Sequence, residues 1–363
     1  MEYVQERVTT LHDLTDPVPS APTDRASIVV PMTEREYAGL APDRVLSELE
    51  RVDPGQVVVP LRASTDRVGP FYDWLADYDL PLSVVWCNGP RLEELLDEHG
   101  LDGEFGKGRD VWLGIGQALD REYVVVHDAD TKSYSRADVA RLLYPLSQGY
   151  DFSKGYYARV ENDRLYGRLF RLFFVPLVRA LESERDAPVL RYLGAFRYAL
   201  AGEFAATTGL AERLRTQRSW GLEVGTLGDA FEYAGFEGST QVDLGTYEHD
   251  HRAVSGPTGL SDMSRHVAAA LFRAVTDHGV DPDYDALPRR YREAAGSLVR
   301  GYELDAEFNG LEYDRTDELE QVETYATAIE PPGPDRRLPA WTDAPLSPAR
   351  VAEAVEADLE AVR

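Results

Sequence analysis

The stretch YVVVHDAD at residues 123–130 decides the predicted fold. An unbroken run of β-branched residues is typical of a strand that is buried on both faces of a parallel sheet. Two carboxylates, Asp128 and Asp130, follow this run at once. In an open α/β sheet, ligands bind just beyond the carboxyl ends of the strands. The stretch therefore predicts a buried strand that ends at a ligand site.

The chain around this stretch alternates between strand and helix patterns. Short apolar runs predict further strands at residues 27–30, 57–59 and 82–86. Amphipathic patterns between the runs predict helices at residues 44–51, 68–77, 91–98 and 109–119. Parallel strands joined by crossover helices give a doubly wound α/β sheet. The first half of the chain is predicted to have this architecture.

The pattern changes after residue 151. The sequence predicts strands at residues 152–160, 198–207 and 240–247, and helices at residues 164–181 and 222–233. Helices then predominate, at residues 262–277, 287–303 and 318–329, and a last helix follows Ser347, its expected N-cap. We therefore predict an α/β domain over residues 1–255 and a helical C-terminal region over residues 256–363.

The composition limits the class of protein. Of 363 residues, 43% are hydrophobic, which permits a large core, and no apolar run reaches the roughly 20 residues of a membrane span. The charged N-terminal sequence predicts no export signal. The single cysteine, Cys87, excludes an intrachain disulfide and a cysteine-rich zinc site. These features predict a cytoplasmic protein.

The chain is strongly acidic. It has 64 Asp and Glu residues against 38 Lys and Arg residues, a net charge of −26, which opposes binding to nucleic acid. Its lysines are Lys107, Lys132 and Lys154 alone. An acidic, lysine-poor surface predicts a halophilic source, because carboxylates stay hydrated and salt screens their repulsion. The alternative is a GC-rich genome that replaces lysine by arginine.

Asp128 and Asp130 are candidate metal ligands. Mg²⁺ or Mn²⁺ prefers oxygen ligands and is typically held by one or two carboxylates together with substrate phosphates. Such an ion neutralises a diphosphate leaving group. In the alternative, one of these residues caps the helix near Arg136. The local pattern does not separate the two, whereas the position at a strand end favours the metal site.

A lysine between glycines and a pair of histidines are the next candidates. Lys107, in the sequence GKGR at residues 106–109, opens a helix. Glycines there permit close approach of a phosphate, and the helix N-terminus and the lysine attract anions. The alternative is an ordinary loop-to-helix turn. His249 and His251 lie on one side of an extended chain, and they are either metal ligands or part of a polar surface turn.

Three arginines, Arg164, Arg168 and Arg171, are spaced to share one face of the helix predicted at residues 164–181. They are suited to an anionic acceptor or to an anionic membrane surface. Salt bridges to this acidic protein itself are the alternative, and the sequence supports it at least as well.

Seven segments of the chain occur in an order that is known from one enzyme family. They are GKGRDVWLGIGQAL, VVVHDAD, FSKGYYARV, LAGEFAAT, WGLEVGTL, QVDLGTYEH and MSRHV. From about residue 27 to about residue 266, the chain thereby resembles glucosyl-3-phosphoglycerate synthases. These are retaining glycosyltransferases that use a nucleotide-diphosphoglucose. The resemblance implies the GT-A fold, an α/β fold with a mainly parallel sheet flanked by helices, and here a helical C-terminal extension.

The resemblance also implies roles for individual residues. It implies that the sugar donor is bound by Pro31, Met32, Thr33, Lys107 and Asp128, the first three around the base. It implies that the metal is bound by Asp130 and His249. It implies that Leu200 and Glu223 lie at the transferred sugar, as candidate catalytic residues, and that Arg164 and His251 bind the acceptor.

The chain departs from the family mainly at the acceptor end. Tyr166 stands where the family has a small hydroxyl residue, and residues 161–163 replace a glycine-rich run. Tyr247 replaces an arginine, and residues 61–64 replace an acidic-serine loop. Each lost charge-assisted contact to an anion costs about 1.5–3 kcal/mol. The acceptor site is therefore predicted to differ from that of the family.

Together these features predict a metal-dependent glycosyltransferase. It would move a hexose, most simply glucose, from UDP- or GDP-glucose to a small acceptor such as 3-phosphoglycerate, with Mg²⁺ or Mn²⁺ as cofactor. One alternative is a phospholipid or glycan acceptor, which Arg168 and Arg171 motivate. Another is a non-catalytic nucleotide-sugar-binding protein, which the lost acceptor residues motivate. A homodimer is compatible with either, and nucleic acid is not an expected partner.

Overall fold

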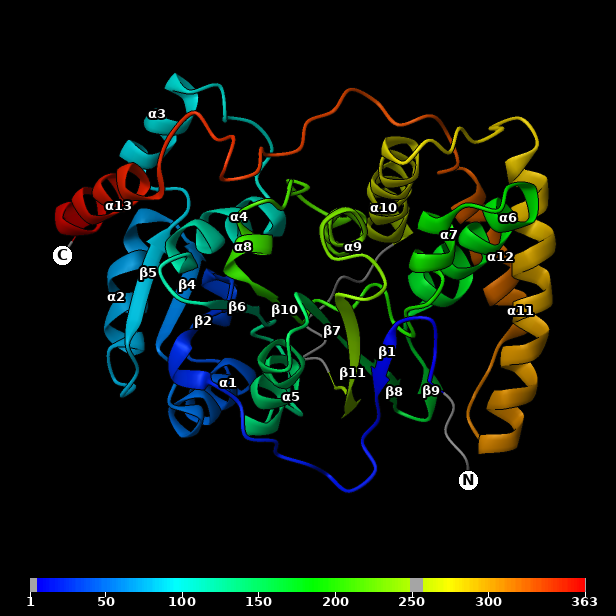
Figure 1. Cartoon of the computed structure of the whole chain (residues 1–363), viewed down its shortest axis with the longest axis horizontal. Coiled ribbons are helices and arrows are strands. Elements are labelled where there is room, and N and C mark those ends of the chain that lie inside the picture. Colours follow the sequence, from blue (N-terminus) through cyan, green and yellow to red (C-terminus); the bar gives the residue numbers. More distant parts are fainter. Residues whose placement is uncertain (1–4, 249–256, 363) are drawn as a thin grey trace.

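The computed structural model describes residues 5–248 and 257–362, without the side chains of residues 257–261. Within them, nine strands form one sheet in the order β1-β11-β7-β10-β6-β2-β4-β3, with β5 beside β4 (Figure 1). The predicted strands of the first half are present as β2 (Ala26–Val29), β4 (Gln56–Arg62), β5 (Leu82–Trp86) and β6 (Tyr123–Val126). These four strands pair with one another in parallel. The predicted α/β sheet is confirmed.

The rest of the sheet makes it mixed rather than wholly parallel. It contains β1 (Thr9–Leu11), β3 (Met32–Thr33), β7 (Phe152–Ala158), β10 (Phe204–Thr207) and β11 (Ser239–Thr246). Strand β10 runs antiparallel between β6 and β7. This inserted strand brings the turn before β10 to the edge at which β6 ends and Asp128 follows, because antiparallel neighbours start where the others finish.

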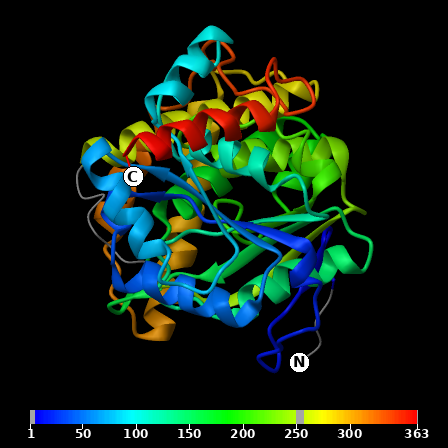
Figure 2. The same cartoon turned by 90° about the vertical axis from the view of Figure 1, so that its left-hand side faces the viewer.

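Helices cover both faces of the sheet (Figures 1 and 2). One face carries α4 (Lys107–Ala118) and α9 (Leu222–Tyr233), and the other carries α1 (Leu40–Val52) and α5 (Arg136–Ser147). Beyond β5 lie α2 (Thr65–Leu75) and α3 (Pro90–Glu98). The shorter helices are η1 (Thr23–Arg25), η2 (Glu34–Glu36), α7 (Pro188–Leu193) and α8 (Thr208–Ala211). No helix within the described residues combines the length and the apolar character needed to cross a membrane.

The prediction of one helix over residues 164–181 is wrong at its start. Arg164 lies in a hairpin of β8 (Val160–Glu161) and β9 (Arg164–Leu165). Asn162 and Asp163 turn the hairpin with φ of 49° and 56°, in the left-handed region that Asn and Asp tolerate better than most residues. The helix begins only after Gly167, first as the π-helical turn η3 (Leu169–Phe174) and then as α6 (Val175–Glu184).

The predicted strand at residues 198–207 is likewise shorter than expected. Only Phe204–Thr207 pairs in the sheet. The preceding residues form a turn that is closed by a hydrogen bond from Ala201 N to Tyr198 O at 3.1 Å. This turn, residues 198–203, borders the site described below.

The C-terminal region is helical, with α10 (Pro257–Asp277), α11 (Leu287–Asn309), α12 (Arg315–Ala326) and α13 (Pro348–Val362). Helix α10 packs on α9, whereas α11 and α12 pack on η3. The chain then crosses to the far side of the molecule, where α13 packs on α2, α3 and α4 (Figure 1). The predicted domain boundary at residue 255 falls outside the described residues, and the division stays a prediction.

Trp341 packs the crossing segment, residues 327–347 between α12 and α13, against helix α4. Its indole stacks on Trp112 with ring centroids 4.0 Å apart. Its Nε1 donates to Trp112 O at 2.9 Å, while Trp112 Nε1 donates to Pro339 O at 2.8 Å. A Cβ at Gly116 would lie 2.3 Å from the Trp341 ring, so glycine is needed for this approach. The last part of the chain thus braces the helix that begins at Lys107.

We expect Trp341→Ala to lower the free energy of unfolding by about 3–5 kcal/mol, the usual cost of truncating a buried tryptophan. Urea unfolding followed by circular dichroism measures the loss. Phe308→Ala is the matched control, because Phe308 is 88% exposed and its truncation should change stability by no more than about 0.5 kcal/mol. Equal losses in the two variants would contradict the bracing role.

Candidate functional site

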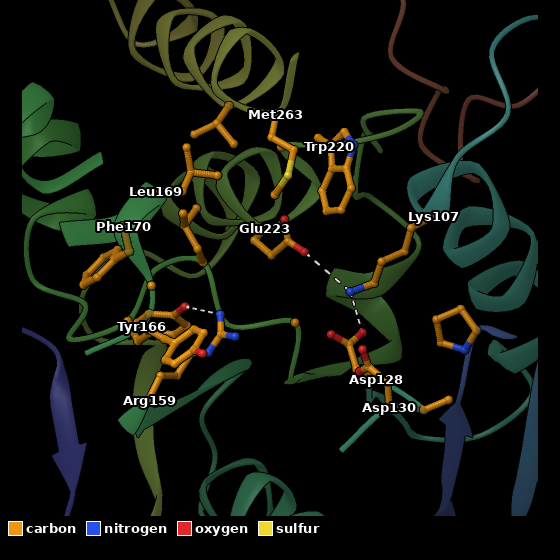
Figure 3. Close-up of a pocket in the computed structure, with 18 of the residues that line it drawn as sticks. Lys107, Asp128, Asp130, Arg159, Tyr166, Leu169, Phe170, Trp220, Glu223 and Met263 are labelled. Carbon is orange, nitrogen blue, oxygen red and sulfur yellow. Dashed lines mark hydrogen bonds and ion pairs between the residues drawn. The ribbon is translucent and has the colours of Figure 1, made fainter. Parts of the chain in front are cut away.

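A cavity of about 690 Å³ opens beyond the carboxyl end of β6, where the topology predicts a ligand site. Figure 3 shows side chains from α4, α9, α10, the loop after β6 and the segment after β7 converging on it. Every residue of the described chain to which the resemblance gives a role lines this cavity: Pro31, Met32, Thr33, Lys107, Asp128, Asp130, Arg164, Leu200 and Glu223. His249 and His251 lie outside the described residues.

Lys107 lies between two carboxylates on one wall of the cavity (Figure 3). It is the first residue of α4, and its Nζ lies 2.5 Å from Asp128 Oδ1 and 3.6 Å from Glu223 Oε1. Burial lowers the pKa of Lys107, but Asp128 and Glu223 outweigh this effect and raise the pKa above its usual range. A permanent positive charge therefore stands at a helix N-terminus, which is a favourable place for a phosphate.

The two glycines beside Lys107 have a structural task that the sequence did not predict. A Cβ at Gly106 would lie 2.7 Å from Arg218 O, and one at Gly108 would lie 1.7 Å from Gln217 O. The glycines thus let α4 pack against the backbone of the 217–219 segment. The sequence analysis explained these glycines by the close approach of a phosphate. The contacts show instead that glycine is needed for packing against residues 217–219.

Asp128 and Asp130 present their carboxylates to the same end of the cavity (Figure 3). Gly202 lies directly against Asp128, since a Cβ at Gly202 would be 2.5 Å from Asp128 Oδ2. No cluster of three His, Cys, Asp or Glu side chains able to hold a metal occurs in the described part of the chain. Two carboxylates at one end of a cavity nevertheless suit Mg²⁺ or Mn²⁺, which take substrate phosphates and water as further ligands.

At the same end, the cavity has a second charged pair that the sequence reasoning missed. Arg62, the last residue of β4, donates from Nε to Asp110 Oδ2 at 3.1 Å, and both residues line the cavity with Pro31–Thr33. Burial raises the pKa of Asp110 to about 6, although Arg62 and Arg109 lower it. The sequence marked the 61–64 segment as a departure from the family, but the partner on α4 was not evident.

The arginines at the opposite end are engaged with acidic residues of the C-terminal region. Arg164 donates to Glu312 from Nε at 2.8 Å and from a terminal nitrogen at 2.5 Å, and its side chain is 63% exposed. Arg168 and Arg171 both pair with Glu318 of α12, each at 3.0 Å. These contacts are the salt bridges that the sequence analysis kept as an alternative to an anion site or a membrane surface.

Arg159 is the residue at this end that the sequence reasoning missed. It follows β7 and points into the cavity beside Tyr166, whose ring centroid lies 6.0 Å from the guanidinium carbon (Figure 3). Its terminal nitrogen donates weakly to Tyr198 Oη at 3.4 Å, and its buried Nε has no hydrogen-bond partner among the described residues. Arg159 directly follows a buried strand, much as Asp128 follows β6, and this position could have marked it as a candidate site residue.

Tyr247, a departure from the family, lies beneath the cavity rather than in its wall. It is buried and stacks on Tyr157 with ring centroids 3.9 Å apart. Its hydroxyl donates to Glu203 and contacts the hydroxyl of Thr131. The tyrosine thus connects the loop that carries Asp128 and Asp130 to the turn before β10.

Comparisons with curated proteins and with solved structures both find glucosyl-3-phosphoglycerate synthases. No family model matches the chain. The glucosyl-3-phosphoglycerate synthase of Methanococcoides burtonii is 36% identical over 95% of this chain and 94% of its own length. The glucosyl-3-phosphoglycerate synthase of Persephonella marina is 35% identical over 83% of this chain and 79% of its own length.

Solved structures of the glucosyl-3-phosphoglycerate synthase from Mycobacterium tuberculosis share the fold. One, in complex with Mn²⁺, UDP and phosphoglyceric acid, is 24% identical and covers 76% of this chain and 88% of its own, with a TM-score of 0.57. Another, in complex with Mg²⁺ and UDP, is 25% identical over the same shares, also with a TM-score of 0.57.

Because the chain has only three lysines, the protonation of each can be followed separately by NMR. With ¹³C-labelled lysine, the chain gives three Cε signals, which Lys→Arg variants assign. We expect the Lys154 signal to titrate at about pH 8, because burial lowers the pKa of Lys154 below the usual lysine value of about 10.4. Lys107 should stay protonated as long as the protein is folded. A Lys154 midpoint above pH 10 would contradict this environment.

Proposed function

Since this chain belongs to the family of glucosyl-3-phosphoglycerate synthases, which are glycosyltransferases, we propose that it transfers glucose from UDP- or GDP-glucose to 3-phosphoglycerate. One observation carries the proposal. The described donor-site candidates and an arginine suited to an anionic acceptor line a single cavity of about 690 Å³, large enough for both substrates.

The donor end of the cavity has groups for each part of a nucleotide-diphosphosugar. Lys107 and the N-terminus of α4 would hold the diphosphate and stabilise the negative charge that develops on it as the glycosidic bond breaks. Glu223 is 3.6 Å from Lys107 Nζ, so it lies where the sugar hydroxyls would follow the diphosphate. Pro31, Met32 and Thr33 would enclose the base beside Arg62 and Asp110.

Asp128 and Asp130 would hold Mn²⁺ or Mg²⁺ against the diphosphate, and His249 stays the predicted third ligand. When bound, such an ion supplies Lewis-acid stabilisation of the leaving diphosphate. Complexes of the tuberculosis enzyme with Mn²⁺ or Mg²⁺ and UDP support the choice of these ions. Lys107 is paired to Asp128, so the lysine and the metal site would lie side by side at the diphosphate.

The acceptor end supports an anionic substrate through Arg159. Five cationic residues of the described chain line the cavity: Arg62, Lys107, Arg159, Arg164 and Arg168. Four of them lie within 4.0 Å of a carboxylate, whereas Arg159 has no such partner among the described residues. A partly buried guanidinium that has no carboxylate within 4.0 Å in the described part of the chain is suited to a carboxylate or phosphate of the substrate. We therefore assign acceptor binding to Arg159 rather than to Arg164.

The alternative acceptors have less support. A phospholipid acceptor was motivated by Arg168 and Arg171, and both are engaged by Glu318. Retention of the anomeric configuration, the base of the donor, a homodimer, a cytoplasmic location and a halophilic source stay predictions.

The proposed reaction is tested by incubating the protein with Mn²⁺, 3-phosphoglycerate and either UDP-glucose or GDP-glucose, and by measuring glucosyl-3-phosphoglycerate by mass spectrometry. Asp130→Asn should lower turnover by about 100-fold or more, because even residues that only orient metal ligands contribute about 10- to 100-fold. Asp120→Asn, on the exposed surface, is the matched control. Absence of product with both donors, at low and at high salt, would refute the proposal.

A second pair of variants tests the acceptor assignment. Arg159→Met should raise the KM for 3-phosphoglycerate by about 10- to 150-fold, since a hydrogen bond to a charged group contributes about 1.5–3 kcal/mol, and should leave the KM for the donor unchanged. Arg164→Met removes a solvent-exposed ion pair with Glu312 that contributes little in water, so the KM for 3-phosphoglycerate should rise less than about fivefold. The reverse order of effects would restore Arg164 as the acceptor-binding residue.

A further inference from the structure

Lys154 is a fully buried lysine that the proposed reaction does not use. It lies in the middle of β7 with 0% of its surface exposed. Its ammonium donates a hydrogen bond to the carbonyl oxygen of Ala201 and lies 5.9 Å from the ring centroid of Phe204. No carboxylate of the described chain lies within ion-pair distance of it. Burial of a charge is costly unless the charge is paired and hydrogen-bonded, and here one hydrogen bond to a neutral carbonyl is what the described residues provide.

The carbonyl that Lys154 binds belongs to the turn over residues 198–203. Leu200 and Gly202 of this turn line the cavity. The backbone of Gly202 lies so close to Asp128 that an added Cβ would be 2.5 Å from the carboxylate. A shift of the turn would therefore change the wall of the cavity and the position of Asp128 together.

The end of the turn is held by a separate set of contacts. The carbonyl of Glu203 accepts a hydrogen bond from Gly155 N at 2.9 Å. The carboxylate of Glu203 accepts one from the hydroxyl of Tyr247. Lys154 and Gly155 are neighbours on β7, so this strand holds the turn at two points, and the side chain of Lys154 supplies the one nearer to the cavity.

We propose that Lys154 is a positioning residue: its ammonium binds the carbonyl of Ala201 and so holds the turn of Leu200 and Gly202 against Asp128 and the donor sugar. The part that concerns the sugar rests on the proposed function. Lysine suits this place because it brings a compact point charge on a flexible stem, whereas arginine brings a wide planar fork. Thirty-five of the 38 Lys and Arg residues are arginine, and this enclosed position is one of the three that have lysine.

The charges around Lys154 keep it effective near neutral pH. Burial lowers its pKa to about 8, with Lys107 acting in the same direction, while Glu223, Glu203 and Asp128 oppose the shift. The amine therefore stays largely protonated at pH 7. Its hydrogen bond to Ala201 is then charge-assisted, which makes it about twice as strong as a neutral one.

Two variants separate positioning from a general effect on the fold. Lys154→Met keeps the length of the side chain without a donor, whereas Lys154→Gln keeps an N–H donor without the charge. We expect kcat to fall by about 100-fold in Lys154→Met, the usual effect of a displacement of about 1 Å at a reacting centre. The KM values for donor and acceptor should stay within about threefold of wild type, as for a lost transition-state contact. Lys154→Gln should recover part of kcat.

The matched control is Val57→Ala, which removes buried volume in β4 away from the turn and should lower the melting temperature without lowering kcat. Equal loss of kcat in Lys154→Met and Lys154→Gln, or a similar loss in Val57→Ala, would overturn the proposal. A crystal structure of Lys154→Met gives a readout that is independent of turnover. A turn displaced from Asp128 supports the proposal and an unmoved turn overturns it, even if the wild-type protein transfers no glucose and the proposed function fails.

Discussion

The contact between Lys107 and Asp128 is the interaction on which the organisation of the site depends. It joins the first residue of α4 to the residue two positions after β6, and Glu223 of α9 lies 3.6 Å from the same ammonium. Three elements that are distant in the sequence thus meet at one positive charge. Because the charge is half-buried and countered by two carboxylates, a movement of one of the three elements alone would separate a charge from its partner.

The same contact explains why the sequence predicted the donor end well. Strand β6 and its two aspartates are a local pattern, and the start of α4 at Lys107 is another. The rules for parallel sheets bring such strand ends and helix starts to one edge, which is where Lys107, Asp128 and Asp130 meet. Leu200 and Glu223 needed the family resemblance, because their segments have no local signature.

The acceptor end could not be predicted in this way because tertiary contacts override the local pattern there. Residues 164–168 have the composition of a helix, but the turn at Asn162 and Asp163 makes a hairpin instead, and Arg164 is then paired with Glu312, far along the chain. In a chain with 64 acidic residues, an arginine is more often neutralised than free. Whether an arginine is already paired with a carboxylate depends on where α12 and the residues before it pack. The sequence around Arg159 does not show that this arginine lacks such a partner among the described residues.

The crossing segment that ends in α13 has a consequence for how the protein is made. Trp341 braces α4 through Trp112, and α4 begins at Lys107. Asp358 of α13 accepts hydrogen bonds from the backbone of Arg91 and Leu92 at the start of α3, each at 3.1 Å. Synthesis proceeds from the N-terminus, so the first half of the sheet is complete long before its last supports exist. The helix that begins at Lys107 therefore acquires its final packing only when residues 339–341 have been made, which links assembly of the site to synthesis of a distant part of the chain.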